Sequence, residues 1–387
     1  MFESDKDKIL ILSATFGDGH KQVAKAISEA VDFCTPDLEP ITLDVMQWLH
    51  PYLYPVSNYF YKKVIKKFPQ VYGYFYQKTK ERSSFSDKLD TLFSSGMGTM
   101  LEIIQMLNPK VVVSTYPFAA RIISKLKEQG LIDLPIVTII TDYTNHSYWL
   151  HPFTDLYVVG SEQVKNRLIA SGVESYKIKC TGIPIMQKFV HTQPREMLAL
   201  KYGLNPNQFT ILVMGGGDGF IGKGISTILA FEKLPVPIQF IIICGRNKKL
   251  QKRLAAELPS SKHKVLLMGY SDNVNELMAL SDLLISKPGG VTISEAMAME
   301  LPLLIYNPLP GQEEENADYL VNLGLGILAE NEKDLIDKIH SIMKDSFRLV
   351  SIKQKTKLFQ TKTSSIDALD VIIQTAYHGR GQYQVNG

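Results

Sequence analysis

The sequence predicts an α/β fold made of two doubly wound domains that face each other across a cleft. Short apolar strands alternate with helical stretches along the chain, which is typical of parallel sheets covered on both faces. Each half opens in the same way, with an apolar strand, a glycine-rich turn and a helix. A length of 387 residues also exceeds what one ordinary core supports, and this favours two domains of nearly equal size.

The first half opens with a predicted strand at residues 8–14, the turn Phe16-Gly17-Asp18-Gly19-His20, and a helix from residue 22 to about 33. Further apolar runs predict strands at 111–114, 136–141 and 156–159. Another strand ends in the breakers of Cys180-Thr181-Gly182-Ile183-Pro184, so we place a boundary there. The first domain is therefore predicted at residues 1–184.

The second half repeats the pattern, with a strand at 209–214, the turn Gly215–Gly219 and a helix around 225–231. Residues 185–205 hold the link and a helix, and the second domain is predicted at 185–365. Its remaining strands are predicted at 238–244, 265–268, 283–286 and 303–306. A last helix around 366–377 and a tail form the final segment, 366–387.

Composition excludes several classes of protein. No stretch of 18 apolar residues occurs, so no transmembrane helix is expected, and the polar start predicts no secretory signal. Cys34, Cys180 and Cys244 are scattered, which argues against disulfides and zinc and fits a reducing cytoplasm. The net charge of +3 gives no reason to expect nucleic-acid binding. The one Asp-x-Asp, Asp5-Lys6-Asp7, precedes the first strand without a partner, so we expect no metal.

Residues 287–316 are the most informative run. Pro288-Gly289-Gly290, the Pro288 turn, follows a buried strand and precedes a helix, so backbone N–H groups and the positive helix end reach a diphosphate. Glu295, one turn later, suits adjacent ribose hydroxyls because a carboxylate accepts two hydrogen bonds. A loop with amide and carboxylate groups for a second sugar follows at Gln312, Glu313 and Asn316. Together these features predict a nucleotide-diphosphate-sugar site, although the turn alone also fits an ordinary strand-to-helix connection.

The other glycine-rich turn leaves two interpretations open. Gly217–Gly222 fits Gly-x-Gly-x-x-Gly after a strand, which is typical of dinucleotide sites. The next strand ends at Arg246 with no carboxylate for a ribose, although an arginine suits a phosphorylated one. In the alternative, Gly216 and Gly217 line a diphosphate opposite Gly290, and Arg246 and Lys287 help stabilise it as it leaves.

The run at 287–316 resembles the donor signature of the inverting glycosyltransferases that include monogalactosyldiacylglycerol synthases, processive diacylglycerol β-glucosyltransferases and, more distantly, the transferase that makes lipid II. The resemblance covers nearly the whole chain. It implies a GT-B fold, a donor nucleotide held by the C-terminal domain, and a last helix, within 366–387, that crosses back to the first domain. It also implies that Glu295 binds the ribose, Gly289 and Gly290 the phosphates, and Gln312 with Glu313 the hexose. Gly269-Tyr270 and Val274 match the family segment whose backbone holds uracil.

His20 and Asp142 are the candidate catalytic residues. The family carries a histidine where His20 stands, and a neutral imidazole suits the removal of a proton from an alcohol that attacks the sugar C1. The alternatives for His20 are capping its helix or donating to the diphosphate. Asp142 follows a predicted strand and precedes His146 and Trp149, a spacing similar to that of relatives. It is a second candidate base, the orienter of His20, or an ordinary turn residue.

The segment 45–80 has no acidic residue and interleaves aromatic side chains with lysines. Aromatic rings favour the headgroup layer of a membrane, and each lysine near an anionic surface adds about 1 kcal/mol. The residues expected to contact membrane and acceptor are Trp48, Tyr59, Phe60, Lys62, Lys63, Lys66 and Lys67. Core packing, a solvated face and, with less support, RNA binding are the alternatives.

We therefore expect a cytoplasmic enzyme, bound peripherally to the inner face of the cell membrane, that transfers a hexose from a UDP-sugar to diacylglycerol or a glycosyl-diacylglycerol. Glucose is the expected hexose, the anomeric centre inverts, and no cofactor is expected because the UDP-sugar is a substrate. No metal is expected because backbone N–H groups, the helix end after Gly290, and Lys287 or Arg246 can stabilise the leaving diphosphate. The alternatives are a lipid II type transferase using UDP-N-acetylglucosamine, a UDP-sugar epimerase, and a non-catalytic UDP-glucose sensor. The acidic run Glu313-Glu314-Glu315 departs from relatives and leaves glucose and galactose open.

Overall fold

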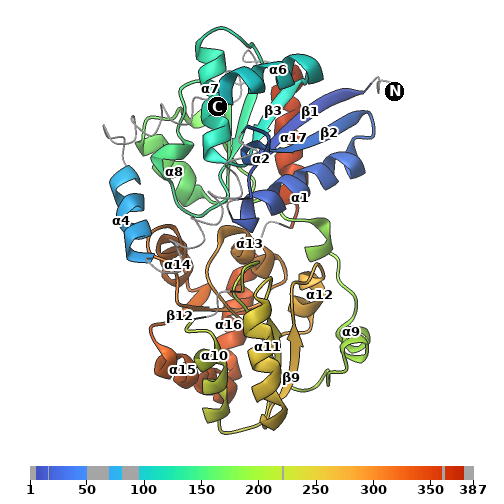
Figure 1. The fold of residues 1–387 in the computed structure, drawn as a ribbon, viewed down its shortest axis with the longest axis vertical. Coiled ribbons are helices and arrows are strands. Elements are labelled where there is room, and N and C mark those ends of the chain that lie inside the picture. The colour runs from blue at the N-terminus through green and yellow to red at the C-terminus, as the bar shows by residue number, and fades with distance from the viewer. Residues whose placement is uncertain are drawn as a thin grey trace. The chain divides into compact units, whose positions relative to one another are not determined.

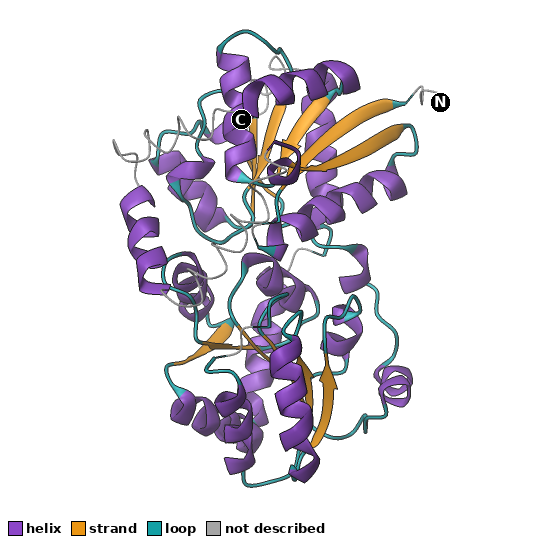
Figure 2. Cartoon of the chain, viewed as in Figure 1, coloured by secondary structure: helices purple, strands orange, loops and turns teal. Residues whose placement is uncertain are grey.

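The computed structural model describes residues 6–15, 17–49, 69–80, 96–219, 222–359 and 362–378. The chain forms two compact units, and each contains a parallel sheet with helices packed around it (Figures 1 and 2). Unit 1 comprises Met1–Gln187, Pro310–Gln312 and Thr363–Gly387, and unit 2 comprises Lys188–Leu309 and Glu313–Lys362. The predicted fold class, two doubly wound α/β units, is confirmed.

Unit 1 contains a six-stranded parallel sheet in the order β2-β1-β3-β4-β5-β6. The strands are β1 Asp7–Ser13, β2 Leu38–Asp44, β3 Val111–Ser114, β4 Ile136–Ile139, β5 Leu156–Val159 and β6 Ile178–Cys180. The helices are α1 Asp18–Cys34, α2 Val45–Leu49, α4 Pro69–Lys80, α6 Met97–Leu107, α7 Pro117–Glu128, α8 Glu162–Ala170 and α17 Ser364–His378, with 3₁₀ turns η2 Ser147–Trp149, η3 Ser175–Lys177 and η4 Gln187–Phe189. Fully buried Val, Leu and Ile side chains of the central strands form the core against α6 and α7.

Helix α1 begins at Asp18, four residues before its predicted start at residue 22, so that boundary was wrong. Gly17 precedes the helix with φ at +87°, a conformation that glycine adopts at little cost. Asp18 then occupies the first turn, where a carboxylate stabilises the positive end of the helix. The earlier start places His20 inside the first turn of α1.

The C-terminal helix α17 belongs to unit 1 and packs against α1 (Figure 1). The hydroxyl of Tyr377 donates a hydrogen bond of 2.7 Å to Oδ2 of Asp7, at the start of β1. Nε2 of Gln187 donates to the hydroxyl of Ser365 at 3.0 Å. Both ends of α17 are therefore tied to residues of unit 1.

Unit 2 contains a second six-stranded parallel sheet, in the order β12-β11-β10-β7-β8-β9. The strands are β7 Thr210–Met214, β8 Gln239–Ile243, β9 Lys264–Met268, β10 Leu283–Ser286, β11 Leu303–Tyr306 and β12 Gly326–Ala329. The helices are α9 Arg195–Tyr202, α10 Ile225–Leu229, α11 Lys248–Glu257, α12 Val274–Ala279, α13 Gly290–Ala298, α14 Gln312–Leu323, α15 Glu332–Lys344 and α16 Ser346–Phe359, with 3₁₀ turns η5 Ala230–Lys233 and η6 Leu258–Ser260. Buried aliphatic side chains of the strands pack on those of α11, α15 and α16.

Each sheet reverses its strand order at one point, which lies between β1 and β3 in unit 1 and between β7 and β10 in unit 2. Open α/β sheets bind ligands at the carboxyl ends of the strands beside such a reversal. The fold alone therefore singles out two places, the loops after β1 and β3 and the loops after β7 and β10. The described helices include none that is both long and apolar enough to cross a membrane.

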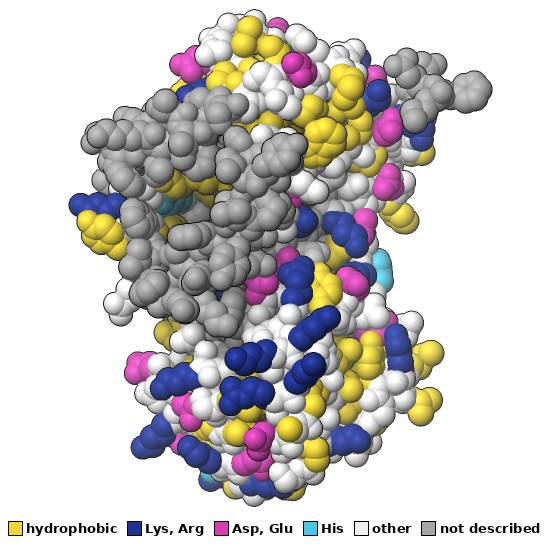
Figure 3. All heavy atoms as spheres, viewed as in Figure 1, with side chains coloured by type: hydrophobic (Ala, Val, Ile, Leu, Met, Phe, Trp, Pro, Cys, Tyr) yellow, Lys and Arg dark blue, Asp and Glu magenta, His cyan; other side chains and the backbone are white. Residues whose placement is uncertain are grey.

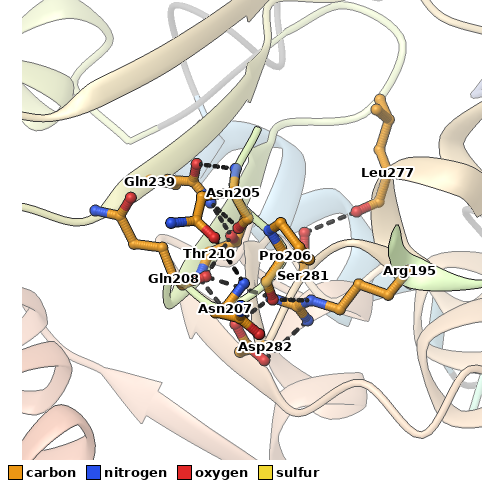
Figure 4. Close-up of polar contacts among 10 residues, drawn as sticks. All are labelled: Arg195, Asn205, Pro206, Asn207, Gln208, Thr210, Gln239, Leu277, Ser281 and Asp282. Carbon is orange, nitrogen blue, oxygen red and sulfur yellow. Dashed lines mark hydrogen bonds and ion pairs between the residues drawn. The ribbon is translucent and has the colours of Figure 1, made fainter. Parts of the chain in front are cut away.

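The amino-terminal edge of the unit 2 sheet is held by one arginine (Figure 4). Both terminal nitrogens of Arg195 donate to the carboxylate of Asp282 at 3.0 Å, and its Nε donates to the carbonyl of Pro206 at 2.9 Å. Oδ2 of Asp282 also accepts the backbone N–H of Thr210 at 2.8 Å. This bidentate pair joins α9 to the starts of β7 and β10. The candidate site lies at the opposite edge of the sheet, where the strands have their carboxyl ends.

Candidate active site

The two glycine-rich turns of unit 2 leave from neighbouring strands. Ser286, the last residue of β10, pairs with Met214, the last residue of β7. The Pro288 turn and the turn Gly215–Gly219 therefore begin side by side at the reversal of strand order. No side chain caps α13, which begins directly after Gly289. Its first backbone N–H groups and positive end are consequently suited to an anion such as a diphosphate.

The turn Gly215–Gly219 packs tightly against the loop after β8. A Cβ atom on Gly219, whose φ is +64°, would lie 1.9 Å from the carbonyl oxygen of Cys244. The carbonyl of Gly217 accepts the backbone N–H of Arg246 at 2.8 Å. Gly216 also has a positive φ, at +70°, and its missing Cβ faces open space. Glycine is therefore required by backbone packing at 219, while Gly216 keeps one side of the turn accessible.

Glu295 is the most unusual side chain of the site. It lies on α13, one turn after the Pro288 turn, and is only 7% exposed. Among the described residues, none donates a hydrogen bond to its carboxylate. Burial raises the pKa of Glu295 from 4.5 to about 8, although the positive charge of Lys188 opposes this shift. A buried carboxyl without a donor is costly when ionised, and hydrogen-bond donors brought by a ligand would reduce that cost.

The predicted loop at Gln312–Asn316 is wrong, because these residues form the start of helix α14. Gly311 has φ at +93° and ends the preceding turn, and three glutamates then stabilise the first turn of the helix. Glu313 is not free to bind a sugar in this structure, because it accepts hydrogen bonds from Nζ of Lys287 at 2.8 Å and from the backbone N–H of Leu309 at 2.7 Å.

Asn316 holds the Pro288 turn through a hydrogen bond. Its side chain is fully buried, and its Nδ2 donates to the carbonyl oxygen of Pro288 at 3.0 Å. Together with the Lys287–Glu313 ion pair, this bond joins α14 to the turn. The structure thus brings Lys287, Glu313 and Asn316 together at the Pro288 turn. Gln312 is the first residue of α14.

The remaining donor residues lie at the carboxyl ends of β8 and β9. The guanidinium of Arg246 lies 4.7 Å from the ring centre of Tyr270, which is a cation–π contact, and its Nη1 lies 3.9 Å from Oδ1 of Asp218. Gly269 and Tyr270 directly follow β9, and Val274 opens α12. These residues share the sheet edge at which the Pro288 turn begins.

Helix α11 adds positive charge at the same edge. Its first two residues are Lys248 and Lys249, and Lys252 and Arg253 follow one turn later, all with exposed side chains. Figure 3 shows lysine and arginine side chains gathered over this helix. Cations in a first helical turn oppose the helix dipole, so this placement is not explained by helix stability. A positive field at the edge favours the approach of an anionic ligand.

In unit 1, His20 lies where the loops after β1, β3 and β4 meet. Its Nδ1 is 3.2 Å from the hydroxyl oxygen of Thr141, and that hydroxyl is 3.4 Å from Oδ2 of Asp142. The hydroxyl of Thr115 donates to the backbone carbonyl of His20 at 3.1 Å. Burial lowers the pKa of His20, whereas the negative charge of Asp142 opposes that shift. A neutral imidazole therefore predominates at neutral pH.

Two aromatic side chains pack near the imidazole of His20. The ring centres of Tyr116 and Trp149 lie 5.3 and 6.0 Å from it. The sequence singled out His20, Asp142 and Trp149, and the structure brings all three together. The sequence did not single out Thr115, Tyr116 or Thr141, because the only feature that marks them is a position at the end of a predicted strand.

His146 has a structural role in α4 and η2. Its Nε2 lies 3.2 Å from the carbonyl oxygen of Tyr76 and 3.4 Å from the hydroxyl of Thr79, and its Nδ1 accepts the N–H of Tyr148 at 3.2 Å. These contacts dock the helix α4, at the end of the aromatic and basic segment, onto the loop that carries Trp149. Both ring nitrogens are thus engaged within unit 1.

Trp48, on α2, has 54% of its surface exposed. The other predicted membrane and acceptor residues, Tyr59, Phe60, Lys62, Lys63, Lys66 and Lys67, lie outside the described residues. Within the described residues, no group of three or more potential metal ligands is present. Cys34, Cys180 and Cys244 are free thiols.

Two doubly wound units, each with a candidate site at the carboxyl ends of its parallel sheet, are the arrangement of the GT-B fold. The fold is similar to that of MurG from Acinetobacter baumannii, with a TM-score of 0.62 and 13% identity over 95% of this chain and 99% of that one. The family model for monogalactosyldiacylglycerol synthase matches residues 20–185, and that for the glycosyltransferase family 28 C-terminal domain matches residues 210–368.

Two relatives cover almost the whole chain. A processive diacylglycerol beta-glucosyltransferase of Bacillus pumilus is 30% identical over 369 residues, which is 95% of this chain and 94% of the relative. One of Staphylococcus aureus strain Newman is 33% identical over 374 residues, which is 94% of this chain and 93% of the relative. The chain therefore belongs to the family of the monogalactosyldiacylglycerol synthases and processive diacylglycerol β-glucosyltransferases, as the resemblance of residues 287–316 predicted.

We predict that Glu295→Gln changes the pH dependence of stability. Between pH 4.5 and about 8 the folded protein holds a proton that the unfolded chain has lost, so the free energy of unfolding falls as pH rises through this window. The amide does not titrate. The variant should therefore gain more than about 1 kcal/mol over the wild type between about pH 5 and about pH 9, measured by urea unfolding without nucleotide.

Glu257→Gln, which removes an exposed carboxylate of α11, is the matched control and should show no such gain. An equal difference between Glu295→Gln and the wild type at both pH values would contradict the raised pKa of Glu295.

Proposed function

We propose that the protein transfers glucose from UDP-glucose to diacylglycerol, or to a glycosylated diacylglycerol, at a membrane surface and inverts the anomeric centre. The observation that carries this proposal is Glu295, a buried carboxylate without a hydrogen-bond donor one turn after an uncapped, glycine-rich helix start. The relatives named processive diacylglycerol beta-glucosyltransferase support the choice of donor and acceptor.

The donor half of the proposal places the diphosphate at the first N–H groups of α13. The ribose then lies beside Glu295, and its two hydroxyls supply the donors that the carboxylate lacks in the free protein. Binding in this form favours the ionised carboxylate, so a proton is released when the nucleotide binds near neutral pH. Arg246 and the exposed cations of α11 attract the diphosphate to the site.

The transfer step is a single displacement at C1 of the sugar. Nε2 of His20 accepts the proton of the acceptor hydroxyl, and the hydroxyl oxygen forms the new bond to C1. The electron pair of the broken C1–O bond leaves with the diphosphate, where the backbone N–H groups of α13 stabilise the developing charge. Attack opposite to the leaving group inverts C1, so an α-linked donor yields a β-linked lipid. In this proposal no metal takes part.

Lipid access is assigned to the segment 45–80 of unit 1. It contains no acidic residue and many lysines and aromatic residues, a composition suited to an anionic surface. Its described parts, α2 and α4, carry the exposed aromatic side chains of Trp48 and Tyr74. A peripheral enzyme of this kind takes its acceptor directly from the bilayer and needs no membrane-spanning helix.

Vesicles that contain diacylglycerol test the substrates. In separate incubations with UDP-glucose, UDP-galactose and UDP-N-acetylglucosamine, we expect the mass of the lipid to rise by one or more hexoses with UDP-glucose, and NMR of the product to show a β linkage. A lipid product from UDP-N-acetylglucosamine alone would point to a lipid II type transferase. Isomerised free UDP-sugar would point to an epimerase, and donor binding without any product to a sensor.

Two variants separate the proposed roles of Glu295 in donor binding and of His20 in catalysis, when the Kd for UDP is measured beside the transfer assay. Glu295→Ala should raise the Kd for UDP by about 10- to 100-fold, because charged hydrogen bonds to the ribose are lost. His20→Ala should leave that Kd within about twofold and lower kcat by about 10²- to 10⁴-fold. Unchanged UDP affinity in Glu295→Ala would remove the ribose assignment, and high turnover in His20→Ala would transfer the role of base to Asp142.

A further inference from the structure

The hydroxyl of Thr141 stands between the proposed base and the nearby carboxylate. It lies 3.2 Å from Nδ1 of His20 and 3.4 Å from Oδ2 of Asp142. A hydroxyl has one proton and can accept at its oxygen, whereas a carboxylate only accepts. The hydroxyl therefore donates to Asp142, and its oxygen is left to accept a proton from Nδ1 of His20. This arrangement favours the tautomer of the neutral imidazole that carries its proton on Nδ1.

We infer that Thr141 is a positioning residue that, through Asp142, holds the proton of His20 on Nδ1 and so leaves Nε2 unprotonated to act as the base. The order of donors is His20 Nδ1–H to Thr141, then Thr141 O–H to Asp142. The backbone of His20 is fixed independently by Thr115, whose hydroxyl donates to the carbonyl of His20. When Nε2 takes the acceptor proton, the imidazolium that forms keeps its Nδ1–H bond, and Asp142 offsets its charge through the polarised hydroxyl. The inference rests on His20 as the base of the proposed function.

Thr141→Val and Thr141→Ser test the inference, because valine keeps the shape of threonine without its hydroxyl, and serine keeps the hydroxyl. We expect Thr141→Val to lower kcat by about 10- to 100-fold with little change in KM for the donor, and Thr141→Ser to stay within about threefold of the wild type. Thr138→Val is the matched control, since Thr138 is a buried residue of β4 whose hydroxyl has no partner among the described residues. It should retain full activity.

Nitrogen-15 NMR of labelled histidine reads the tautomer without any turnover. The His20 signals, assigned by their loss in His20→Ala, should show the proton on Nδ1 in the wild type and move in Thr141→Val. An unchanged tautomer with full kcat in Thr141→Val would overturn the inference, and so would equal losses in the serine and valine variants. Full activity in His20→Ala would instead remove the proposed base, while the NMR result would still stand.

Discussion

The buried carboxylate of Glu295 is the constraint on which the proposed donor site depends. A helix that starts on glycine at a sheet edge offers N–H groups to any anion, and such starts are common. What distinguishes this one is a carboxyl group one turn further on, held away from water without a donor of its own. Hydroxyl donors from a ligand would recover the free energy that burial costs, and this is why we propose a ligand that carries both a phosphate and a diol.

The surroundings of the Pro288 turn serve to keep that geometry fixed. Asn316 holds the carbonyl of Pro288, and Lys287 and Glu313 neutralise each other beside it. At the other edge of the sheet, Arg195 and Asp282 anchor the starts of β7 and β10, the strands that carry the two glycine-rich turns. The starts of β7 and β10 and the turn that follows β10 are therefore each held by charged or amide groups.

The central strands of both sheets could be predicted from the sequence because both of their faces are buried and they read as continuous apolar runs. The edge strands β2 and β12 were missed. The first contains Glu39 and Pro40 and the second starts at Gly326, and these residues are tolerated at an edge because one side of the strand needs no partner. The start of α1 was placed too late because Asp18 and Gly19 look like turn residues when the positive φ of Gly17 is unknown.

The local structure of a candidate site could be predicted where one short motif sets it, as at the Pro288 turn and the helix that carries Glu295. Contacts that depend on the register of separate strands could not. Thr141 meets His20 only because β1, β3 and β4 are neighbours, and nothing in the local sequence marks its hydroxyl.

The structure of the protein with UDP bound tests the central claim most directly. The account predicts the diphosphate against the first N–H groups of α13 and both ribose hydroxyls on the carboxylate of Glu295. A nucleotide bound elsewhere in unit 2, or one at the Pro288 turn with no contact to Glu295, would contradict it.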